Sequence, residues 1–299
     1  MAWRNSKAIQ MGLGGAAVFA AYLITTRRKT TQESSRPGYK IVPLRSSRLP
    51  QIDYMDVAGQ KHVIHVLTEM DVTQARGLLR AHKERTGQAL SFTAYLVACV
   101  ARAVDADKMA HAYRQGRRKL VIFEDVDVNT LIERPVGDRT IPVPYVIRAA
   151  NHRTFREIHQ EIRAAQGEQV EVTGRLNLMK WYWLLPPVLG RAFWRLLLNN
   201  PFLMKRTPGT VSVSAVGMFG QGAGWGIPIT GYTLQVIVGG ISEKPGVVNG
   251  KIEPRQYLSL TLCFDHDIID GAPAARFTSR LKELIEGAHD LDFLSGEAS

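Results

Sequence analysis

Hydrophobic and polar positions along the first half of the chain repeat with the periods of both helices and strands. Val63–Met70 alternates as a strand does, and Thr73–Arg85 carries its apolar residues on one helical stripe. Ser91 is a candidate N-cap for a helix over Phe92–Val104, which is apolar nearly all round and should be buried. The pattern therefore predicts a strand followed by two helices, the second of them in the core.

The remaining pattern adds more strands and two further helices. Thr154 and Glu157 form a capping box that predicts a helix to about Gln166. Alternation and β-branched residues predict strands at Leu120–Ile132, Thr140–Ala149, Thr210–Val216, Thr233–Gly240 and Gln256–Asp265, with an Asn249-Gly250 hairpin turn and a closing helix at Gly271–Glu286. Because no strict βαβ rhythm holds, the predicted class is α+β, a mixed-sheet α/β sandwich.

The N-terminal segment differs from the rest in hydropathy. Met11–Thr26 is uncharged, and extending the run back to Ala8 gives 19 residues, close to the roughly 20 that a membrane-spanning helix needs. More basic residues follow the run than precede it, which predicts that the body of the protein lies on the cytoplasmic side. We expect residues 1–29 to be an anchor that spans the membrane at 8–26. A mitochondrial presequence, a secretory signal and an apolar tail packed on the protein are the alternatives.

The charge follows the same division. Lys and Arg number 38 against 27 Asp and Glu, a net charge of +11, of which +8 lies in residues 1–50. The body is close to neutral, which argues against nucleic-acid binding. Residues 30–50 are rich in Ser, Thr, Pro and Arg and are predicted to be a linker, which leaves 51–299 as one domain.

The segment 174–206 has three of the five tryptophans, many leucines, six basic residues and no acid. This composition suits an interfacial membrane helix that contacts lipid. It also suits a pair of packed helices interrupted at Pro186-Pro187. Both interpretations remain open from the sequence.

Several residue groups with chemical potential have simpler explanations. Five glycines within residues 217–226 lack the features of a phosphate-binding or dinucleotide-binding loop, so we expect a loop whose backbone passes close to another segment. His62 and His65 fall on opposite faces of a strand, which disfavours a shared metal. Cys99 and Cys263 are expected to be core thiols, and no metal site is predicted.

The strongest candidate site is the sequence FDHDIIDGAPAARF at Phe264–Phe277. A strand of alternating apolar residues ends at His266, and Asp270-Gly271 turns the chain into a helix. A histidine at the rigid end of a buried strand is well suited to act as a general base near neutral pH.

The His266-x-x-x-Asp270-Gly271 motif resembles the CoA-dependent acyltransferase superfamily, which includes chloramphenicol acetyltransferase. Val211–Gly220, the glycine-rich loop, the hairpin and the Leu-x-Leu-x-x-Asp-His sequence resemble the catalytic domain of 2-oxoacid dehydrogenase acyltransferases. Glu69–Thr73 is similar to an early turn of the same family, so the likeness covers about residues 55–290. A chloramphenicol acetyltransferase-like fold is therefore expected.

The resemblance implies an acyl transfer between coenzyme A and a thiol acceptor such as dihydrolipoamide. His266 would be the general base, Ser214 would stabilise the tetrahedral intermediate, and Asp270 would hold the loop. It also implies a homotrimer with the active site between subunits and acyl-CoA as a substrate. The chain is expected to bear no covalently bound lipoyl group, so a lipoyl-carrying protein would act in trans.

One departure from the family pattern affects the expected chemistry. Asp267 follows His266 where the dehydrogenase group usually has arginine. Together with Asp265 and Asp270 it should crowd negative charge around the imidazole, favour the imidazolium, and repel the phosphates of coenzyme A. Transfer to a hydroxyl or amine, and a non-catalytic membrane-tethered trimeric scaffold, are the alternative functions.

Overall fold

The structure is a computed structural model that describes residues 35–36, 38–45, 48–136, 139–167, 182, 185–215 and 222–294. The chain divides into two compact units, one formed by Met1–Asp56 with Glu171–Trp194 and the other by Val57–Val170 with Arg195–Ser299.

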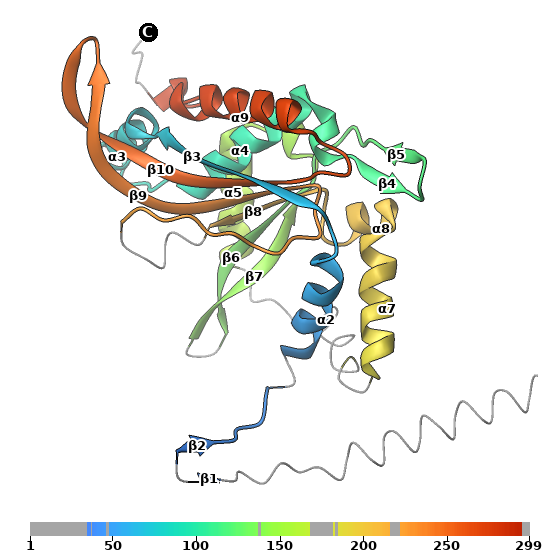
Figure 1. Ribbon diagram of the computed structural model, residues 1–299. Coiled ribbons are helices and arrows are strands. Elements are labelled where there is room, and N and C mark those ends of the chain that lie inside the picture. Colours follow the sequence, from blue (N-terminus) through green and yellow to red (C-terminus); the bar gives the residue numbers. More distant parts are fainter. Residues whose placement is uncertain are drawn as a thin grey trace, which may run out of the picture. The chain divides into compact units, whose positions relative to one another are not determined.

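The larger unit is built on a six-stranded mixed sheet in the order β3-β10-β9-β8-β6-β7 (Figure 1). The β8 strand pairs in parallel with β9 and with β6, and the other neighbouring strands are antiparallel. The strands are β3 Val63–Asp71, β6 Val128–Val136, β7 Arg139–Ile147, β8 Val211–Ala215, β9 Leu234–Val248 and β10 Lys251–Asp265. This mixed sheet confirms the predicted class.

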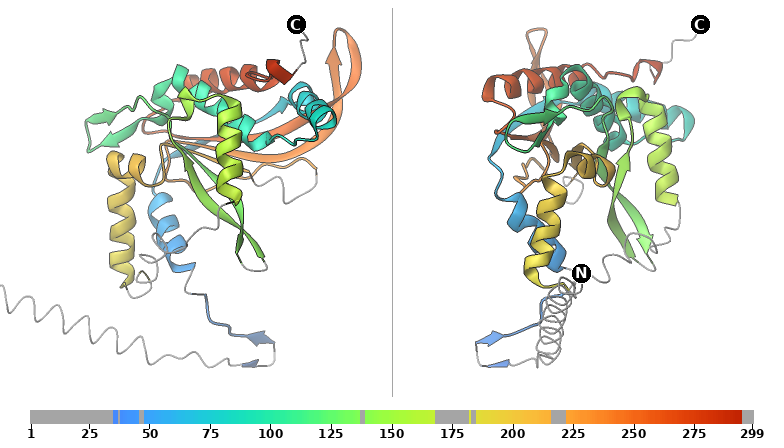
Figure 2. Two further views of the ribbon diagram at one scale, coloured as in Figure 1. Left: turned by 180° about the vertical axis from the view of Figure 1, so that it is seen from behind. Right: turned by 90° about the vertical axis from the view of Figure 1, so that its right-hand side faces the viewer.

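Helices α3, α4, α5 and α9 cover one face of the sheet (Figures 1 and 2). They comprise Thr73–Thr86, Phe92–Ala106, Phe155–Gly167 and Gly271–Glu286. The α4 helix is buried along most of its length, as its uniformly apolar sequence predicts. The core lies between these helices and the sheet, and it includes Leu258, Leu260, Leu262 and Phe264 of β10.

Shorter elements connect this framework. They are the β4–β5 hairpin (Tyr113–Gln115 and Lys119–Val121), helix α8 (Pro201–Arg206) and the 3-10 helices η2 (Lys108–His111), η3 (Ala150–His152) and η5 (Asp292–Leu294).

Two helix starts follow the predicted capping chemistry. The Ser91 hydroxyl accepts a hydrogen bond from the Ala94 amide at the start of α4. At α5, the Glu157 carboxylate accepts from the Thr154 amide, and the Thr154 hydroxyl accepts from the Glu157 amide. The hairpin turn is also confirmed, since Asn249 and Gly250 both have positive φ.

The prediction of one continuous strand over Leu120–Ile132 is wrong. The β5 strand ends at Val121 and β6 begins at Val128, with irregular chain between them. Asp127 explains part of the interruption, because its carboxylate accepts hydrogen bonds from the Ala149 amide and from Arg148. These partners lie 21 and 22 residues away in sequence and hold the buried Asp127 carboxylate in place, so the alternation of a strand does not decide the path of the chain here.

The smaller unit contains β1 (Ser35–Arg36), β2 (Tyr39–Lys40) and most of helices α2 (Leu49–Ala58) and α7 (Pro187–Leu198). Within it, the rings of Tyr54 and Trp194 meet edge to face at 5.2 Å. A Cβ on Gly190 would lie 2.2 Å from an Asp53 carboxylate oxygen, so α2 and α7 approach closely there. The interruption predicted at Pro186-Pro187 is the start of α7.

The structure describes only part of the segments that were predicted to contact the membrane. The proposed span at 8–26 lies outside the described residues, and so does most of 174–184. Among the residues that are described, no helix has the length and apolarity to span a membrane. The outer stripe of α7 exposes Val188, Leu189, Phe193 and Leu196.

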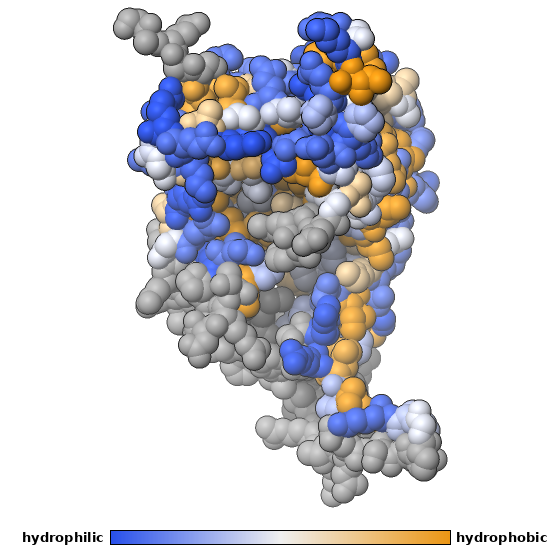
Figure 3. All heavy atoms as spheres, turned by 90° about the vertical axis from the view of Figure 1, so that its left-hand side faces the viewer, coloured by the Kyte–Doolittle hydropathy of each residue, from blue (hydrophilic) through white to orange (hydrophobic). Residues whose placement is uncertain are grey.

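The β9–β10 hairpin projects beyond the other strands (Figure 1). Only Tyr257–Asp265 of β10 pairs with β3, so the outer part of the hairpin is a two-stranded arm. Val247 and Ile252 face each other near its end and are 76% and 77% exposed. Figure 3, which views the molecule from the side on which the arm projects, shows hydrophobic residues at its end beside hydrophilic ones.

Candidate active site

His266 occupies a rigid turn directly after β10. Its amide donates to the His62 carbonyl at 2.7 Å, and the amides of Ile268 and Ile269 donate to the Asp265 carbonyl. The turn leads into α9, which starts at Gly271. The imidazole is about half exposed, so a fixed backbone at the end of the strand presents it to solvent.

The acidic neighbours of His266 have cationic partners of their own. The buried Asp265 carboxylate lies 2.6 Å from the Lys61 ammonium. Asp267 accepts from His62 Nδ1 at 2.9 Å and from Arg114. The hydrogen bond from His62, aided by the Arg114 guanidinium, holds the pKa of Asp267 below its usual value. The expected crowding of uncompensated charge around His266 is therefore wrong for these two acids.

Asp270 is the acid that lies near the imidazole. Its Oδ1 is 3.8 Å from His266 Nδ1, and its side chain is 84% exposed. It precedes α9 but makes no capping hydrogen bond with its side chain. The described contacts of the turn therefore come mainly from Asp265 and Asp267, neither of which the sequence singled out as a support for His266.

Ser214 lies near the end of β8, well away from His266 of the same chain. It is level with Ile237 of β9, which is level with Thr261 of β10. His266 is five residues beyond Thr261, a displacement of about 16 Å along the strand, with two strand spacings of nearly 5 Å across the sheet. One copy of the chain therefore does not bring these two side chains into hydrogen-bonding contact.

The glycine-rich loop after β8 runs close to β9. Gly240 N donates to the Gly224 carbonyl at 3.2 Å, and Gly224 N donates to the Ser259 hydroxyl. A Cβ on Gly239 would lie 2.0 Å from Gly224 O, and one on Gly240 would lie 1.7 Å from Gly222 O. The predicted close backbone approach is confirmed for the described part of this loop.

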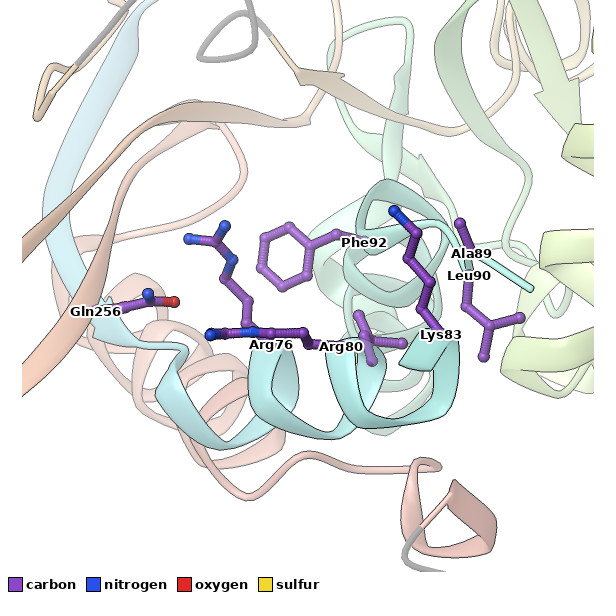
Figure 4. Close-up of a pocket in the computed structure, with 8 residues that line it drawn as sticks. Arg76, Arg80, Lys83, Ala89, Leu90, Phe92 and Gln256 are labelled. Atoms are coloured by element: carbon purple, nitrogen blue, oxygen red, sulfur yellow. The ribbon is translucent and has the colours of Figure 1, made fainter. Parts of the chain in front are cut away.

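The structure contains a basic pocket that was not predicted from the sequence. Arg76, Arg80 and Lys83 of α3 line it together with Leu79, Ala89, Leu90, Phe92 and Gln256, and its volume is about 440 Å³ (Figure 4). Arg76 and Lys83 extend on either side of the Phe92 ring (Figure 4). Burial, with the charge of Arg80, lowers the pKa of Arg76. The spacing of the three cations at i, i+4 and i+7 was the available signal.

A second pocket adjoins the His266 turn. Its volume is about 470 Å³, and its lining includes Lys61, Tyr113, Arg114, Asp265 and Asp267. Lys61 and Arg114, the partners of Asp265 and Asp267, therefore lie in the wall of this pocket.

Both cysteines belong to the buried core, as the sequence predicted. Cys99 and Cys263 are buried, and burial raises the pKa of each thiol to about 12. Neither is therefore suited to act as a thiolate nucleophile. Within the described part of the chain, no cluster of three or more potential ligands could hold a metal ion.

The segment that contains both Ser214 and His266 is similar to a known protein family. Residues 204–292 match the family model described as 2-oxoacid dehydrogenases acyltransferase (catalytic domain). The chain is related to this acyltransferase family. A curated relative is the human mitochondrial dihydrolipoyllysine-residue succinyltransferase component of the 2-oxoglutarate dehydrogenase complex, 24% identical over 231 residues. That match covers 75% of this chain and 44% of the human protein, so the chain spans less than half the length of this relative.

Further proteins named as dihydrolipoyl or dihydrolipoamide acyltransferases are similar in sequence or fold. The corresponding Saccharomyces cerevisiae protein is 39% identical over 82 residues, covering 27% of this chain and 17% of the yeast protein. A probable dihydrolipoamide acetyltransferase from Listeria monocytogenes superposes with a TM-score of 0.61 at 21% identity, covering 88% of this chain and 99% of that one. The Azotobacter vinelandii dihydrolipoamide acetyltransferase gives 0.59 at 20% identity, with 83% and 91% covered. The expected acyltransferase fold is thus confirmed.

Proposed function

We propose that this protein transfers an acyl group between coenzyme A and a thiol acceptor of the dihydrolipoamide type. The observation that carries the proposal is the spacing of three polar residues within the matched segment. His266 follows Ser214 by 52 residues, and Asp270 follows His266 by four. The Azotobacter vinelandii enzyme was investigated for the role of a serine, a histidine and an asparagine in its catalytic mechanism, and these have the same spacing. Here an aspartate takes the place of the asparagine.

The proposed reaction gives each residue a defined task. The His266 imidazole accepts the proton of the attacking thiol, and the thiolate adds to the thioester carbonyl carbon. The Ser214 hydroxyl donates a hydrogen bond to the resulting oxyanion, an interaction worth about 2.7–4 kcal/mol in the transition state. Collapse of the tetrahedral intermediate expels the second thiolate, which takes the proton back from the imidazolium. No redox step or metal is required.

The separation of Ser214 and His266 supports a site shared between subunits. Because one chain keeps them about 16 Å apart along the sheet, we propose that Ser214 of one subunit works with His266 of a neighbour in a homotrimer. A solved relative forms the cubic core of the pyruvate dehydrogenase multienzyme complex. Closed oligomers of this kind are compatible with sites built at subunit contacts.

The basic pocket is our candidate for the phosphates of coenzyme A. Its three cations have no acid among the other lining residues, and charge-assisted hydrogen bonds to phosphate are worth about 1.5–3 kcal/mol each. Gln256 lies five residues from Thr261, on the side away from His266. This puts the pocket about 16 Å along β10 from the level of Ser214.

The function is tested with the full chain by following release of free CoA thiol from acetyl-CoA or succinyl-CoA in the presence of dihydrolipoamide. We expect His266→Ala to abolish turnover, and Ser214→Ala to lower kcat by about 10²–10³-fold. Wild-type turnover equal to that of His266→Ala would overturn the proposal. Release supported only by a hydroxyl or amine acceptor would assign the alternative chemistry.

Mixing the two inactive variants tests the shared site. If subunits exchange, equal amounts of Ser214→Ala and His266→Ala should regain about one quarter of the wild-type activity, because random assembly pairs an intact serine with an intact histidine at that frequency. No recovery, once exchange has been verified by mass spectrometry, would contradict a site built from two chains.

A separate measurement tests the basic pocket. Arg76→Ala and Arg80→Ala should raise KM for acyl-CoA by about 10-fold or more, since each removes a charged donor. The same enzymes are assayed with the dephospho-CoA thioester. If the pocket holds the 3′-phosphate, wild-type enzyme should prefer CoA and the variants should lose that preference. An unchanged preference would assign the phosphate to another place.

Whether residues 1–29 are a membrane anchor or a presequence determines where the protein is located in the cell. Several relatives are named as mitochondrial, which favours the presequence alternative for residues 1–29. Alkaline carbonate extraction and N-terminal sequencing of the mature protein distinguish them. A soluble protein with a new N-terminus indicates a presequence, whereas an intact protein retained in the pellet indicates the anchor.

A further inference from the structure

The turn that carries His266 is held by its own backbone and by two acids of different exposure. Every amide from 265 to 269 donates a hydrogen bond, to Thr233 O, to His62 O, to Asp265 Oδ1 and twice to Asp265 O. These bonds fix the path of the chain on both sides of the imidazole. They all depend on where Asp265 and the segment around His62 lie.

The Asp265 carboxylate supports the inner side of this turn. It is buried, pairs with Lys61 and accepts the Asp267 amide at 3.1 Å. Its removal would leave the part-buried Lys61 ammonium without this partner and would destabilise the fold. A substitution of Asp265 therefore cannot distinguish a role in positioning His266 from a role in the stability of the core.

The Asp267 carboxylate supports the outer side. One oxygen accepts from His62 Nδ1 and the other from Arg114 Nη1. His62 comes from the segment just before β3, and Arg114 comes from β4. This Arg114–Asp267–His62 cluster therefore ties two separate segments to the residue that follows His266, without touching the imidazole itself.

We propose that Asp267 is a positioning residue for His266, acting through the Arg114–Asp267–His62 cluster to fix the turn that aims the imidazole. The inference rests on the proposed function for its kinetic consequence and on the contacts of the cluster for its geometry. The Asp267 side chain is 32% exposed, and ion pairs that are open to solvent contribute about 0–1 kcal/mol to stability. A shift of about 1 Å in a catalytic group, in contrast, lowers the rate by about 100-fold.

The experiment is a charge exchange in the full-length protein. Asp267→Arg and Arg114→Asp each place like charges together, and the double variant restores an opposite pair. We expect each single variant to lower kcat by about 10- to 100-fold with KM for acyl-CoA changed by no more than about twofold. The double variant should recover most of the loss. Unchanged kcat in the single variants, or a double variant as slow as either single variant, would overturn the proposal.

A matched control places like charges together at a different exposed ion pair. Lys108 and Glu124 form one on the surface, and neither belongs to the His266 turn. Glu124→Arg should leave kcat within about twofold of wild type. Thermal unfolding of every variant verifies folding, and a loss of kcat that tracks Tm across the set would assign Asp267 a merely structural role and overturn the proposal.

A second readout does not need turnover. Carbethoxylation of His266 by diethylpyrocarbonate is followed by peptide mass spectrometry. Its rate should change by at least about threefold in each single variant and return in the double variant. If wild-type protein shows no acyl transfer, the proposed function fails, but a coupled change in this rate still supports the positioning role. An unchanged rate in the single variants overturns that role.

Discussion

Replacement of Gly240 by alanine tests the close crossing of the glycine-rich loop over β9. A Cβ at this position would lie 1.7 Å from Gly222 O, whereas ordinary contacts begin near 3.4 Å. The loop would have to retreat by about 1.7 Å, the difference between those distances. Backbone atoms cannot rotate out of the way as a flexible side chain can, so the displacement must involve the loop as a whole.

The cost of Gly240→Ala follows from this displacement. Overpacking of this kind costs about 1–3 kcal/mol. Loss of the Gly240–Gly224 and Gly224–Ser259 hydrogen bonds adds about 1 kcal/mol or less each. We therefore expect the free energy of unfolding to fall by about 2–4 kcal/mol, which corresponds to a decrease in Tm of roughly 5–15 °C for a domain of this size.

The assay is urea unfolding with Gly77→Ala as the matched control. Gly77 lies within α3, and no atom apart from the neighbouring backbone of the helix comes within 4 Å of the place that an added Cβ would take, so the same substitution meets no obstacle there. Alanine in a helix is favoured over glycine by about 0.5–1 kcal/mol, and the control should be more stable than wild type. If Gly240→Ala is neutral or stabilising, the close crossing is refuted.

Three further predictions concern charge, and each is measured by urea unfolding over a pH series. Lys61→Met leaves the buried Asp265 carboxylate unpaired and should lower the free energy of unfolding by about 3 kcal/mol at pH 7; an unchanged value would contradict this. Burial lowers the pKa of His111 from 6.5 to about 4, so stability should fall as pH drops from 6.5 toward 4, and His111→Gln should flatten that decline. Burial raises the pKa of Asp71, but hydrogen bonds from Thr73 and others outweigh it and lower the pKa overall from 3.8. Its contribution should be present above pH 3.8 and be lost as pH falls through the lowered value, and Asp71→Asn should remove that loss.

Local signals predicted much of this fold because their causes are local. The Thr154–Glu157 capping box, the Asn249-Gly250 turn and the alternating residues of β10 each depend on contacts between near neighbours in sequence. The start of α9 at Gly271 was predicted for the same reason. These features needed no knowledge of the rest of the molecule.

The errors and omissions arose where distant segments decide the outcome. The irregular chain before β6 depends on the partners of Asp127, which come from residues 148 and 149. The charge around His266 depends on Lys61 and Arg114, which are far away in sequence. The separation of Ser214 from His266 depends on strand register. None of these can be obtained from periodicity or spacing alone.

The strand order has a consequence for biosynthesis. Residues of β3 pair with residues of β10 that lie 186 to 202 positions later in the chain, so β3 has no partner in the sheet until β10 has been made. Contacts between such distant segments slow folding and leave apolar strands exposed on the nascent chain. Slower translation or a lower growth temperature should therefore raise the yield of soluble protein, because β10, which joins β3 to the rest of the sheet, emerges from the ribosome long after β3.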